Sequence, residues 1–359
     1  MVQKILRLVV TGLLAILISR SARADWLCSG QSNMVLGQIP PEIQAEYPLV
    51  LGENLSAACF WFAVDLTNAL GVPMRFWNRA ESSSSIYAWL GPAATDDPDP
   101  IVQRLLARRA RRGYLFDRSI APLAAAGIPI EGVFWWQGES NKNRPLDYAH
   151  LLQALIRSWR VLWPEVPFIF VQLPSGGGVS YPGVVLPLPP DVTKSMKGTA
   201  PQMRQAYLQT LNTVARTGMV ISAGLPGGVH PPAKEDYGKS AARVAVALVY
   251  GGTDPYAGPT YSGYDLEPGR IRVHFWPRTA EGMFSLDGPP QGFAIAGPDG
   301  HYVWAAAAID GDTVVVSSPE VPFPVSIRYA YASRPQWANL FNNDGMVAAP
   351  FSTDPLPQP

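Results

Sequence analysis

The chain has 359 residues, and its 28 basic and 28 acidic side chains give a formal net charge of zero at pH 7. This balance excludes any argument from bulk charge for binding to nucleic acid or to an anionic membrane. Two cysteines are too few for a disulfide-rich scaffold, and the length suits two domains better than one small core.

The first 24 residues have the pattern of an export signal. Lys4 and Arg7 give a basic start, residues 8–18 are mostly apolar, and Ala22-Arg23-Ala24 resembles a cleavage site. A membrane anchor is the alternative, but the apolar run is short for a bilayer span. We therefore expect cleavage after Ala24 and a periplasmic or secreted protein without a stable membrane anchor.

Residues 25–252 alternate between strand-like and helix-like segments. Strands are expected at 26–29, 74–77, 130–135, 167–172 and 219–222, and helices at 54–70, 114–126, 147–163, 202–215 and 233–250. This alternation predicts a three-layer α/β domain with a parallel sheet, whose functional sites gather at the carboxyl ends of the strands.

Residues 253–359 have a different pattern of short runs separated by turn residues. The runs cover 270–275, 293–296, 302–309, 313–317 and 326–332. They predict a small antiparallel β-domain that packs on the first domain, with carbohydrate binding as the alternative role.

The two cysteines, Cys28 and Cys59, fall on the first strand and the following helix. They could pair in an oxidising compartment, but a disulfide needs specific geometry, so buried thiols are favoured. Neither cysteine has the spacing of metal ligands and the four histidines are scattered, so we expect no metal and no cofactor.

Ser32 lies in Gly30-Gln31-Ser32-Asn33-Met34, directly after the first expected strand. A serine at such a strand-to-helix turn can expose its hydroxyl, and a histidine can deprotonate it for attack on a carbonyl carbon. Alone, the run is a weak signal, because a serine between polar residues is usually part of a loop or a helix N-cap.

Three further motifs accompany this block: Trp136-Gln137-Gly138-Glu139-Ser140-Asn141, Val229-His230-Pro231, and the segment 71–89. In this order the four motifs resemble the sialate O-acetylesterase family of carbohydrate esterases, within the SGNH hydrolase superfamily. The resemblance runs from about residue 26 to the C-terminus, and the N-terminal β-domain usual in that family has no counterpart in this sequence. It implies an SGNH-hydrolase-like domain over 25–252.

The resemblance also implies roles for individual residues. Ser32 would be the nucleophile and His230 its base. The oxyanion donors would be the Ser32 N–H, a backbone N–H at Ser82 or Ser83, where the family usually has glycines, and the side-chain amide of Gln137 or Asn141.

The family's orienting aspartate is missing, because the matching positions are Gly227 and Gly228. Three outcomes stay open: a Ser–His dyad oriented by a backbone carbonyl, a substitute carboxylate, or loss of catalysis with retention of binding. Glu139 is the first choice as substitute and Asp236 the poorer one, since the latter follows the histidine on the next helix.

Two segments have open interpretations. Residues 173–201 form a long loop rich in Pro and Gly, which we expect to lie over the site. Residues 101–112 carry five arginines, which suit a solvated helix face or, alternatively, an anion-binding surface for an acidic sugar.

The sequence therefore predicts an exported serine esterase that removes O-acetyl groups from sialic acid or another acetylated carbohydrate. The alternative is a catalytically silent carbohydrate-binding relative. A general lipase or peptidase is disfavoured, because the serine does not lie in G-x-S-x-G. The expected partner is the acetylated carbohydrate, and no nucleic acid is expected.

Overall fold

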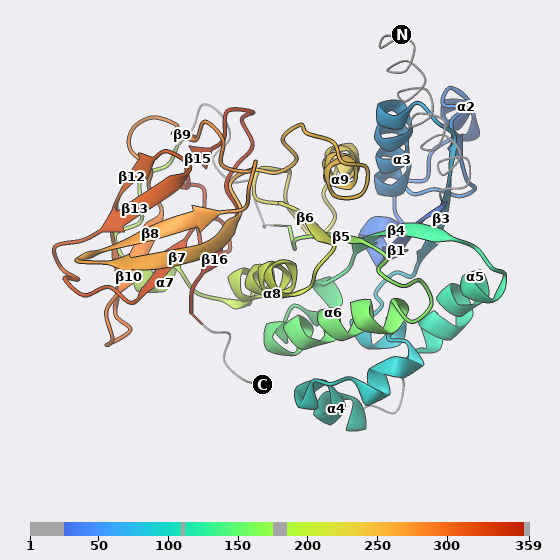
Figure 1. Cartoon of the computed structure of the whole chain (residues 1–359), viewed down its shortest axis with the longest axis horizontal. Coiled ribbons are helices and arrows are strands. Elements are labelled where there is room, and N and C mark those ends of the chain that lie inside the picture. The colour runs from blue at the N-terminus through green and yellow to red at the C-terminus, as the bar shows by residue number, and fades with distance from the viewer. Residues whose placement is uncertain (1–24, 109–111, 175–184, 355–359) are drawn as a thin grey trace, which may run out of the picture.

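The structure is a computed structural model that describes residues 25–108, 112–174 and 185–354. A six-stranded parallel sheet forms the centre of its N-terminal part (Figure 1). In spatial order the strands are β2 (Val50–Leu51), β3 (Met74–Ala80), β1 (Asp25–Gly30), β4 (Ile130–Trp136), β5 (Phe168–Val171) and β6 (Thr217–Val220). The predicted export signal, residues 1–24, lies outside the described residues.

Successive side chains of these strands enter two different cores, as the alternation of a pleated strand requires. Leu27 of β1 packs on one face and its neighbours Trp26 and Cys28 pack on the other. Helices α6 (Pro145–Trp159) and α8 (Thr199–Thr213) cover the first face, while α3 (Ala57–Leu70) and α9 (Lys234–Val249) pack together on the second (Figure 1). The predicted three-layer α/β fold is confirmed.

All five expected helices differ from the observed ones by one or more residues at their ends, and two of the differences have a clear local reason. The helix expected from residue 54 begins at Ala57, because Ser56 is its N-cap and Asn54 has a φ of 55°. The helix expected over 114–126 contains a π-helical turn, η4 (Phe116–Ile120), followed by α5 (Ala121–Ala125). Pro122 lies at the start of α5, where it removes an N–H donor from the helical ladder.

The loops of the α/β part contain further short elements. They are η1 (Ser32–Met34), α2 (Pro41–Ala45), η2 (Ile86–Trp89), η3 (Pro92–Asp96), α4 (Pro100–Ala107), η5 (Glu139–Asn141) and α7 (Val192–Ser195). The last of these, with the first turn of α8, lies within the segment expected to be a long loop. Residues 175–184 of that segment lie outside the described residues.

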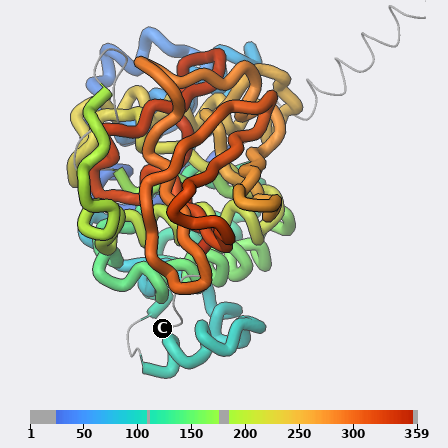
Figure 2. The backbone as a smooth tube through the Cα atoms, turned by 90° about the vertical axis from the view of Figure 1, so that its left-hand side faces the viewer, coloured from blue at the N-terminus to red at the C-terminus, as the bar shows by residue number. Residues whose placement is uncertain are grey.

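The C-terminal part is antiparallel β-structure, seen in front in Figure 2 in orange and red. One four-stranded sheet has the order β11 (Tyr302–Trp304), β10 (Phe293–Ala296), β14 (Ser326–Tyr329), β16 (Phe351–Ser352). A second four-stranded sheet has the order β12 (Ala306–Asp310), β13 (Thr313–Ser317), β8 (Arg270–Phe275), β7 (Tyr261–Glu267). A two-stranded sheet consists of β15 (Leu340–Phe341) and β9 (Phe284–Ser285). The single run expected over 302–309 is divided, because its halves, β11 and β12, belong to different sheets. Strands β7, β9, β15 and β16 were not expected.

The two parts share an apolar core. Buried Val133 of β4, Ile271 of β8 and Ile295 of β10 belong to one continuous cluster. The C-terminal sheets therefore pack directly on the helical layer of the α/β part.

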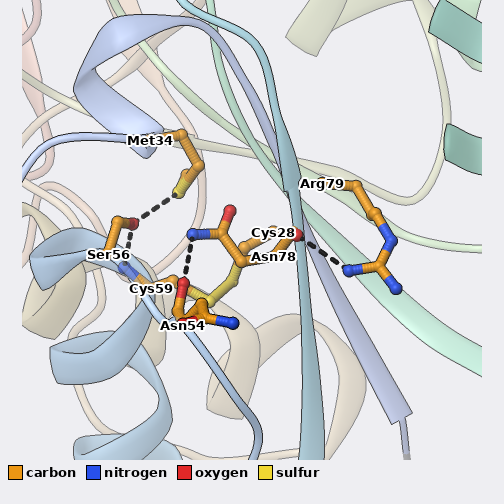
Figure 3. Close-up of a disulfide and its surroundings, with 7 residues drawn as sticks. All are labelled: Cys28, Met34, Asn54, Ser56, Cys59, Asn78 and Arg79. Carbon is orange, nitrogen blue, oxygen red and sulfur yellow. Dashed lines mark hydrogen bonds between the residues drawn. A yellow bond between two sulfur atoms is a disulfide. The ribbon is translucent and has the colours of Figure 1, made fainter. Parts of the chain in front are cut away.

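A disulfide joins Cys28 and Cys59, so the expectation of two free thiols was wrong (Figure 3). The Cys28 side chain points to the face of the sheet on which the first turn of α3 packs, so it meets Cys59. The Cα atoms of the two cysteines are 5.9 Å apart. That separation lies in the usual range for a disulfide. Beside it, Ser56 Oγ caps the Cys59 N–H and donates to Met34 Sδ at 3.7 Å, which ties the serine block to α3.

Within the described ranges, no helix combines the length and apolar character that a bilayer span requires.

Candidate active site

Ser32 and His230, which are 198 positions apart, meet at the carboxyl edge of the parallel sheet. Ser32 opens η1 directly after β1, and His230 lies between β6 and α9. The His230 Nε2 atom lies 2.9 Å from Ser32 Oγ. His230 is exposed and Ser32 is 9% exposed, so the hydroxyl and its base lie at a surface that solvent reaches. This is the contact that a serine nucleophile and its general base require.

The backbone ahead of Ser32 is fixed against β4. Gly30 has a φ of 141°, and a Cβ on it would lie 2.0 Å from the Trp136 carbonyl oxygen, so only glycine fits. The Gln31 N–H donates to the same carbonyl at 2.9 Å. The serine turn therefore cannot shift along the sheet without breaking the contact between β1 and β4.

Gln137 holds the loops that follow three strands. Its Nε2 lies 3.1 Å from Gln31 Oε1 after β1, 3.1 Å from the Ser84 carbonyl after β3, and 2.8 Å from Asn141 Oδ1 after β4. The side chain is fully buried, and its two amide protons are shared among these protein acceptors. In this conformation the Gln137 amide serves the loop packing.

Asn141, the other amide expected as an oxyanion donor, is also engaged with protein. Its Oδ1 accepts from the Ile86 N–H at 3.1 Å, and its Nδ2 donates to Ser85 Oγ at 3.1 Å. Both amides thus connect the β4 loop to the segment after β3.

Ser82 and Ser83, on that segment, are exposed. Ser83 has a φ of 60°, in the left-handed region that glycine adopts without strain. The serine keeps a conformation suited to glycine, and its backbone N–H is retained.

Glu139 makes its hydrogen bond to Asn33 and not to the imidazole. The Asn33 Nδ2 donates to Glu139 Oε1 at 2.8 Å and to the Val229 carbonyl at 2.9 Å. On its other side, Asn33 Oδ1 accepts from Lys234 Nζ at 3.0 Å. We call Glu139, Asn33 and Lys234 the support network, because it lies between the serine turn and the chain segment that carries His230.

The support network is charged and removed from water. Burial raises the pKa of the Glu139 carboxyl above its ordinary value, and hydrogen bonding from Asn33 and the charge of Lys234 oppose that rise. Burial lowers the pKa of the Lys234 ammonium, and the charge of Glu139 opposes this shift. Each charge therefore lessens the desolvation cost of the other, with the Asn33 amide between them.

An orienting acid is absent at the imidazole. Every Asp and Glu of the chain falls in the described residues, and none of them hydrogen-bonds to His230. Asp236 lies in the first turn of α9 without a bond to the ring. Gly228, at one of the two positions where an aspartate is usual, has a φ of 107°. The observed unit is a Ser–His pair.

Sequence reasoning did not assign roles to Gln31, Asn33 and Lys234. The first two lie within the serine block, so their amides could have been considered as loop-holding groups. Lys234 follows His230 by four positions at the start of an apolar helix, and a lysine at a helix N-terminus is unfavourable unless it has a partner.

Comparison with known proteins gives two informative matches, while no family model matches the chain. Human sialate O-acetylesterase is 27% identical over 209 residues, which cover 42% of this chain and 39% of that protein. A carbohydrate acetylesterase from Xanthomonas citri has a structure that superimposes with a TM-score of 0.75 at 26% identity, over 93% of this chain and 81% of that one.

The chain is thus similar in sequence to a sialate O-acetylesterase and in structure to a carbohydrate acetylesterase. The resemblance inferred from the four motifs is thereby confirmed. The chain spans less than half the length of the human relative, whereas the structural match extends over both the α/β part and the C-terminal β-structure. Relative to the motif pattern that the sequence resembles, the pair of glycines at 227 and 228 is the difference that bears most on chemistry.

Proposed function

We propose that this protein is an exported carboxylic ester hydrolase that removes O-acetyl groups from a carbohydrate through a Ser32–His230 dyad. The observation that carries the proposal is the 2.9 Å contact between His230 Nε2 and Ser32 Oγ. The similarity to a carbohydrate acetylesterase and to a sialate O-acetylesterase supports the acetylated sugar as substrate.

The reaction follows from the groups in place. Ser32 Oγ attacks the acetyl carbonyl while His230 Nε2 accepts the hydroxyl proton, and the imidazolium then protonates the departing sugar oxygen. Water then attacks the carbonyl of the acetyl-Ser32 ester while His230 accepts its proton, and acetate is released as the Ser32 hydroxyl is restored. The Ser32 N–H, at the first position of η1 where no helical acceptor exists, and the N–H of Ser82 or Ser83 are the proposed oxyanion donors.

Glu139 has an indirect role in this proposal. It fixes Asn33, and Asn33 in turn holds the carbonyl of Val229, the residue before the base. Glu139 and Asn33 are therefore positioning residues, and the support network takes over part of the orienting work of the missing aspartate. Gln137 and Asn141 position the loops in the same sense.

The disulfide supports export. Such bonds persist in oxidising compartments and are rare in the cytosol, so Cys28–Cys59 agrees with a periplasmic or secreted location and with the signal pattern in residues 1–24.

The test compares Ser32→Ala with Ser285→Ala, a control serine in the C-terminal β-structure. Hydrolysis of p-nitrophenyl acetate and acetate release from an acetylated oligosaccharide are expected to fall at least a thousandfold only in Ser32→Ala. Labelling of Ser32 by a fluorophosphonate, read by mass spectrometry, checks the activated hydroxyl directly. Equal rates in both variants would refute the esterase site.

The second candidate, a silent carbohydrate-binding relative, is favoured by the bare imidazole. It predicts binding of the acetylated oligosaccharide without acetate release and without fluorophosphonate labelling of the wild type.

A further inference from the structure

The chain segment that carries His230 lies at the boundary between the two parts of the molecule. It follows β6, which is the edge strand of the parallel sheet on the side of the C-terminal β-structure (Figure 1). We call residues 221–230 the base segment, because they end at the proposed base. The placement of the imidazole against Ser32 therefore depends on what holds this segment.

The α/β part holds the base segment by hydrogen bonds at three places. The Ser222 hydroxyl donates to the Leu173 carbonyl at 2.9 Å. The Tyr237 hydroxyl, from α9, donates to the Pro226 carbonyl at 2.8 Å. Closer to the imidazole, the support network holds the Val229 carbonyl. A fourth contact, at residue 224, comes from the C-terminal part.

Val347 of the C-terminal part occupies the space that a side chain at Gly224 would need. A Cβ atom on Gly224 would lie 2.6 Å from Val347 Cγ1 and 3.4 Å from Val347 Cβ. The first distance is too short for two carbon atoms, whereas the second is a van der Waals contact. Val347 is only 6% exposed and belongs to the shared apolar core. The base segment is thus packed against a side chain from outside the α/β part.

Val347 has little freedom to move away from this contact. Its side chain has a single torsion angle, which the two γ-methyl groups restrict. Its backbone is packed against Gly258, where a Cβ atom would lie 2.0 Å from the Val347 carbonyl oxygen. Pressure on the valine is therefore passed to the base segment.

A buried amide fixes the turn that carries this valine. Asn342 is fully buried, and its Oδ1 accepts from the N–H groups of Asp344 and Met346 at 3.2 and 2.9 Å. Its Nδ2 donates to the carbonyls of Ala257 and Thr279 at 3.1 and 3.3 Å. The first two bonds close the turn, and the other two tie it to the segments after α9 and after β8. The turn therefore presents its valine from a rigid support.

A cavity of about 270 Å³ lies beside the contact between Gly224 and Val347. The base segment, α9 and the turn at 344–347 line it, so the base segment has room to shift when the valine is shortened. Further along, a Cβ atom on Gly228 would meet nothing within 4 Å, so packing does not hold the chain there.

We propose that Val347 is a positioning residue for His230, and that the C-terminal β-structure sets the path of the base segment through Gly224. This inference rests on the proposed function and gives the C-terminal part a role in it. No carboxylate among the described residues hydrogen-bonds to the imidazole, so the ring depends on its own chain for its position. A misplacement of about 1 Å at a catalytic group can lower a rate about a hundredfold.

The test is a cycle of single and double variants, read as kcat and KM with p-nitrophenyl acetate. Gly224→Ala is expected to lower kcat about tenfold with little change in KM, because the new methyl group displaces the base segment. Adding Val347→Ala removes the 2.6 Å clash and leaves the 3.4 Å contact, so most of the lost kcat is expected to return. The matched control adds Val321→Ala, a valine 8% exposed in another turn of the C-terminal part, and no recovery is expected.

An unchanged kcat in folded Gly224→Ala protein would overturn the proposal, as would recovery that Val321→Ala gives equally well. If Gly224→Ala does not fold, Val347→Ala and Val321→Ala are compared alone, at a temperature where both are folded. Val347→Ala is then expected to lower kcat severalfold more than Val321→Ala, and equal values would contradict the positioning role.

The NMR signals of the His230 ring, assigned by comparison with His230→Gln, report the displacement without turnover. They are expected to shift in Gly224→Ala and to return towards their wild-type positions in the double variant with Val347→Ala. Failure of the esterase proposal is separate, because it shows as absent hydrolysis by the wild type. This inference fails when the ring signals, or the kcat of an active wild type and its variants, do not follow the cycle.

Discussion

The Ser32–His230 pair and the support network behind it differ in their exposure to solvent and in how many of their polar groups are hydrogen-bonded. The pair lies at the surface and has one hydrogen bond between its members, with the second imidazole nitrogen unbonded among the described residues. In the network, Asn33 and Lys234 are buried and Glu139 is half-buried, and the Asn33 amide uses both protons and its oxygen. The reactive groups are thus left accessible, whereas the support network behind them is fixed by hydrogen bonds within the protein.

The largest expected effect concerns the disulfide, which we expect to contribute to the stability of the fold and not to turnover. Replacing both Cys28 and Cys59 with serine opens a link across 31 positions and is expected to reduce the free energy of unfolding by about 3–4 kcal/mol. Urea unfolding measures this loss, and turnover at 20 °C should change less than threefold. A comparable fall in turnover of the folded protein would show that the disulfide also shapes the reactive pair.

The next effect tests whether the support network acts on the base. Asn33→Ala removes the hold on the Val229 carbonyl and leaves Lys234 without one of its acceptors. A fall in kcat of about a hundredfold, equivalent to about 2.7 kcal/mol, is expected with a small change in KM. Lys234→Met should lower kcat less, and the matched control Lys239→Met, on the exposed side of α9, should not. A change confined to KM would contradict a positioning role.

Glu139→Gln tests how much the negative charge of Glu139 contributes to turnover and to stability. The amide still offers an oxygen to Asn33, so turnover is expected to fall only about tenfold, but more than in Asp236→Asn. Because burial raises the pKa of Glu139, its protonated form favours folding, and the wild type loses that contribution as pH rises above the ordinary value of 4.5.

The wild type should therefore lose stability relative to Glu139→Gln as the pH rises from about 4 to about 7. Urea unfolding at several pH values measures this, with exposed Glu53→Gln as the control. A stability difference that does not vary with pH would contradict the buried, charged carboxylate.

The smallest effect concerns the backbone. Ser83→Gly removes the strain of a serine at a φ of 60° and is expected to stabilise the fold by up to about 1 kcal/mol, with turnover kept or slightly raised. Thermal unfolding and the rate with p-nitrophenyl acetate measure it. A loss of turnover would show that the serine side chain contributes to the site.

The sequence was informative where a pattern is local. Period-two and helical patterns predicted the parallel sheet and its layers, and Gly71 ended α3 as expected, with a φ of 68°. The motif order predicted the family. Pairing across space was harder to predict, because the disulfide depends on how β1 packs against α3, which no local pattern states.

The same limit applies to the site. The approach of Asn33 to Glu139 and Val229 joins three loops, and it depends on the register between β1 and β4 and on the path of the chain after β6. Sequence spacing carries no measure of those distances. The sequence showed that Gly227 and Gly228 replace the expected aspartate, but it did not show the support network of Glu139, Asn33 and Lys234.

The carbonyl of Gln137 receives the hydroxyl protons of two buried tyrosines, Tyr148 at 2.7 Å and Tyr207 at 2.6 Å. The hydroxyl of Tyr207 also occupies the space in which Gly138 would otherwise carry a side chain. The peptide plane after β4 is therefore locked from below by two separate helices. The loop after β4 is therefore fixed before substrate binds. We expect selectivity among esters to depend on how well their shape fits this rigid loop, with little conformational change on binding.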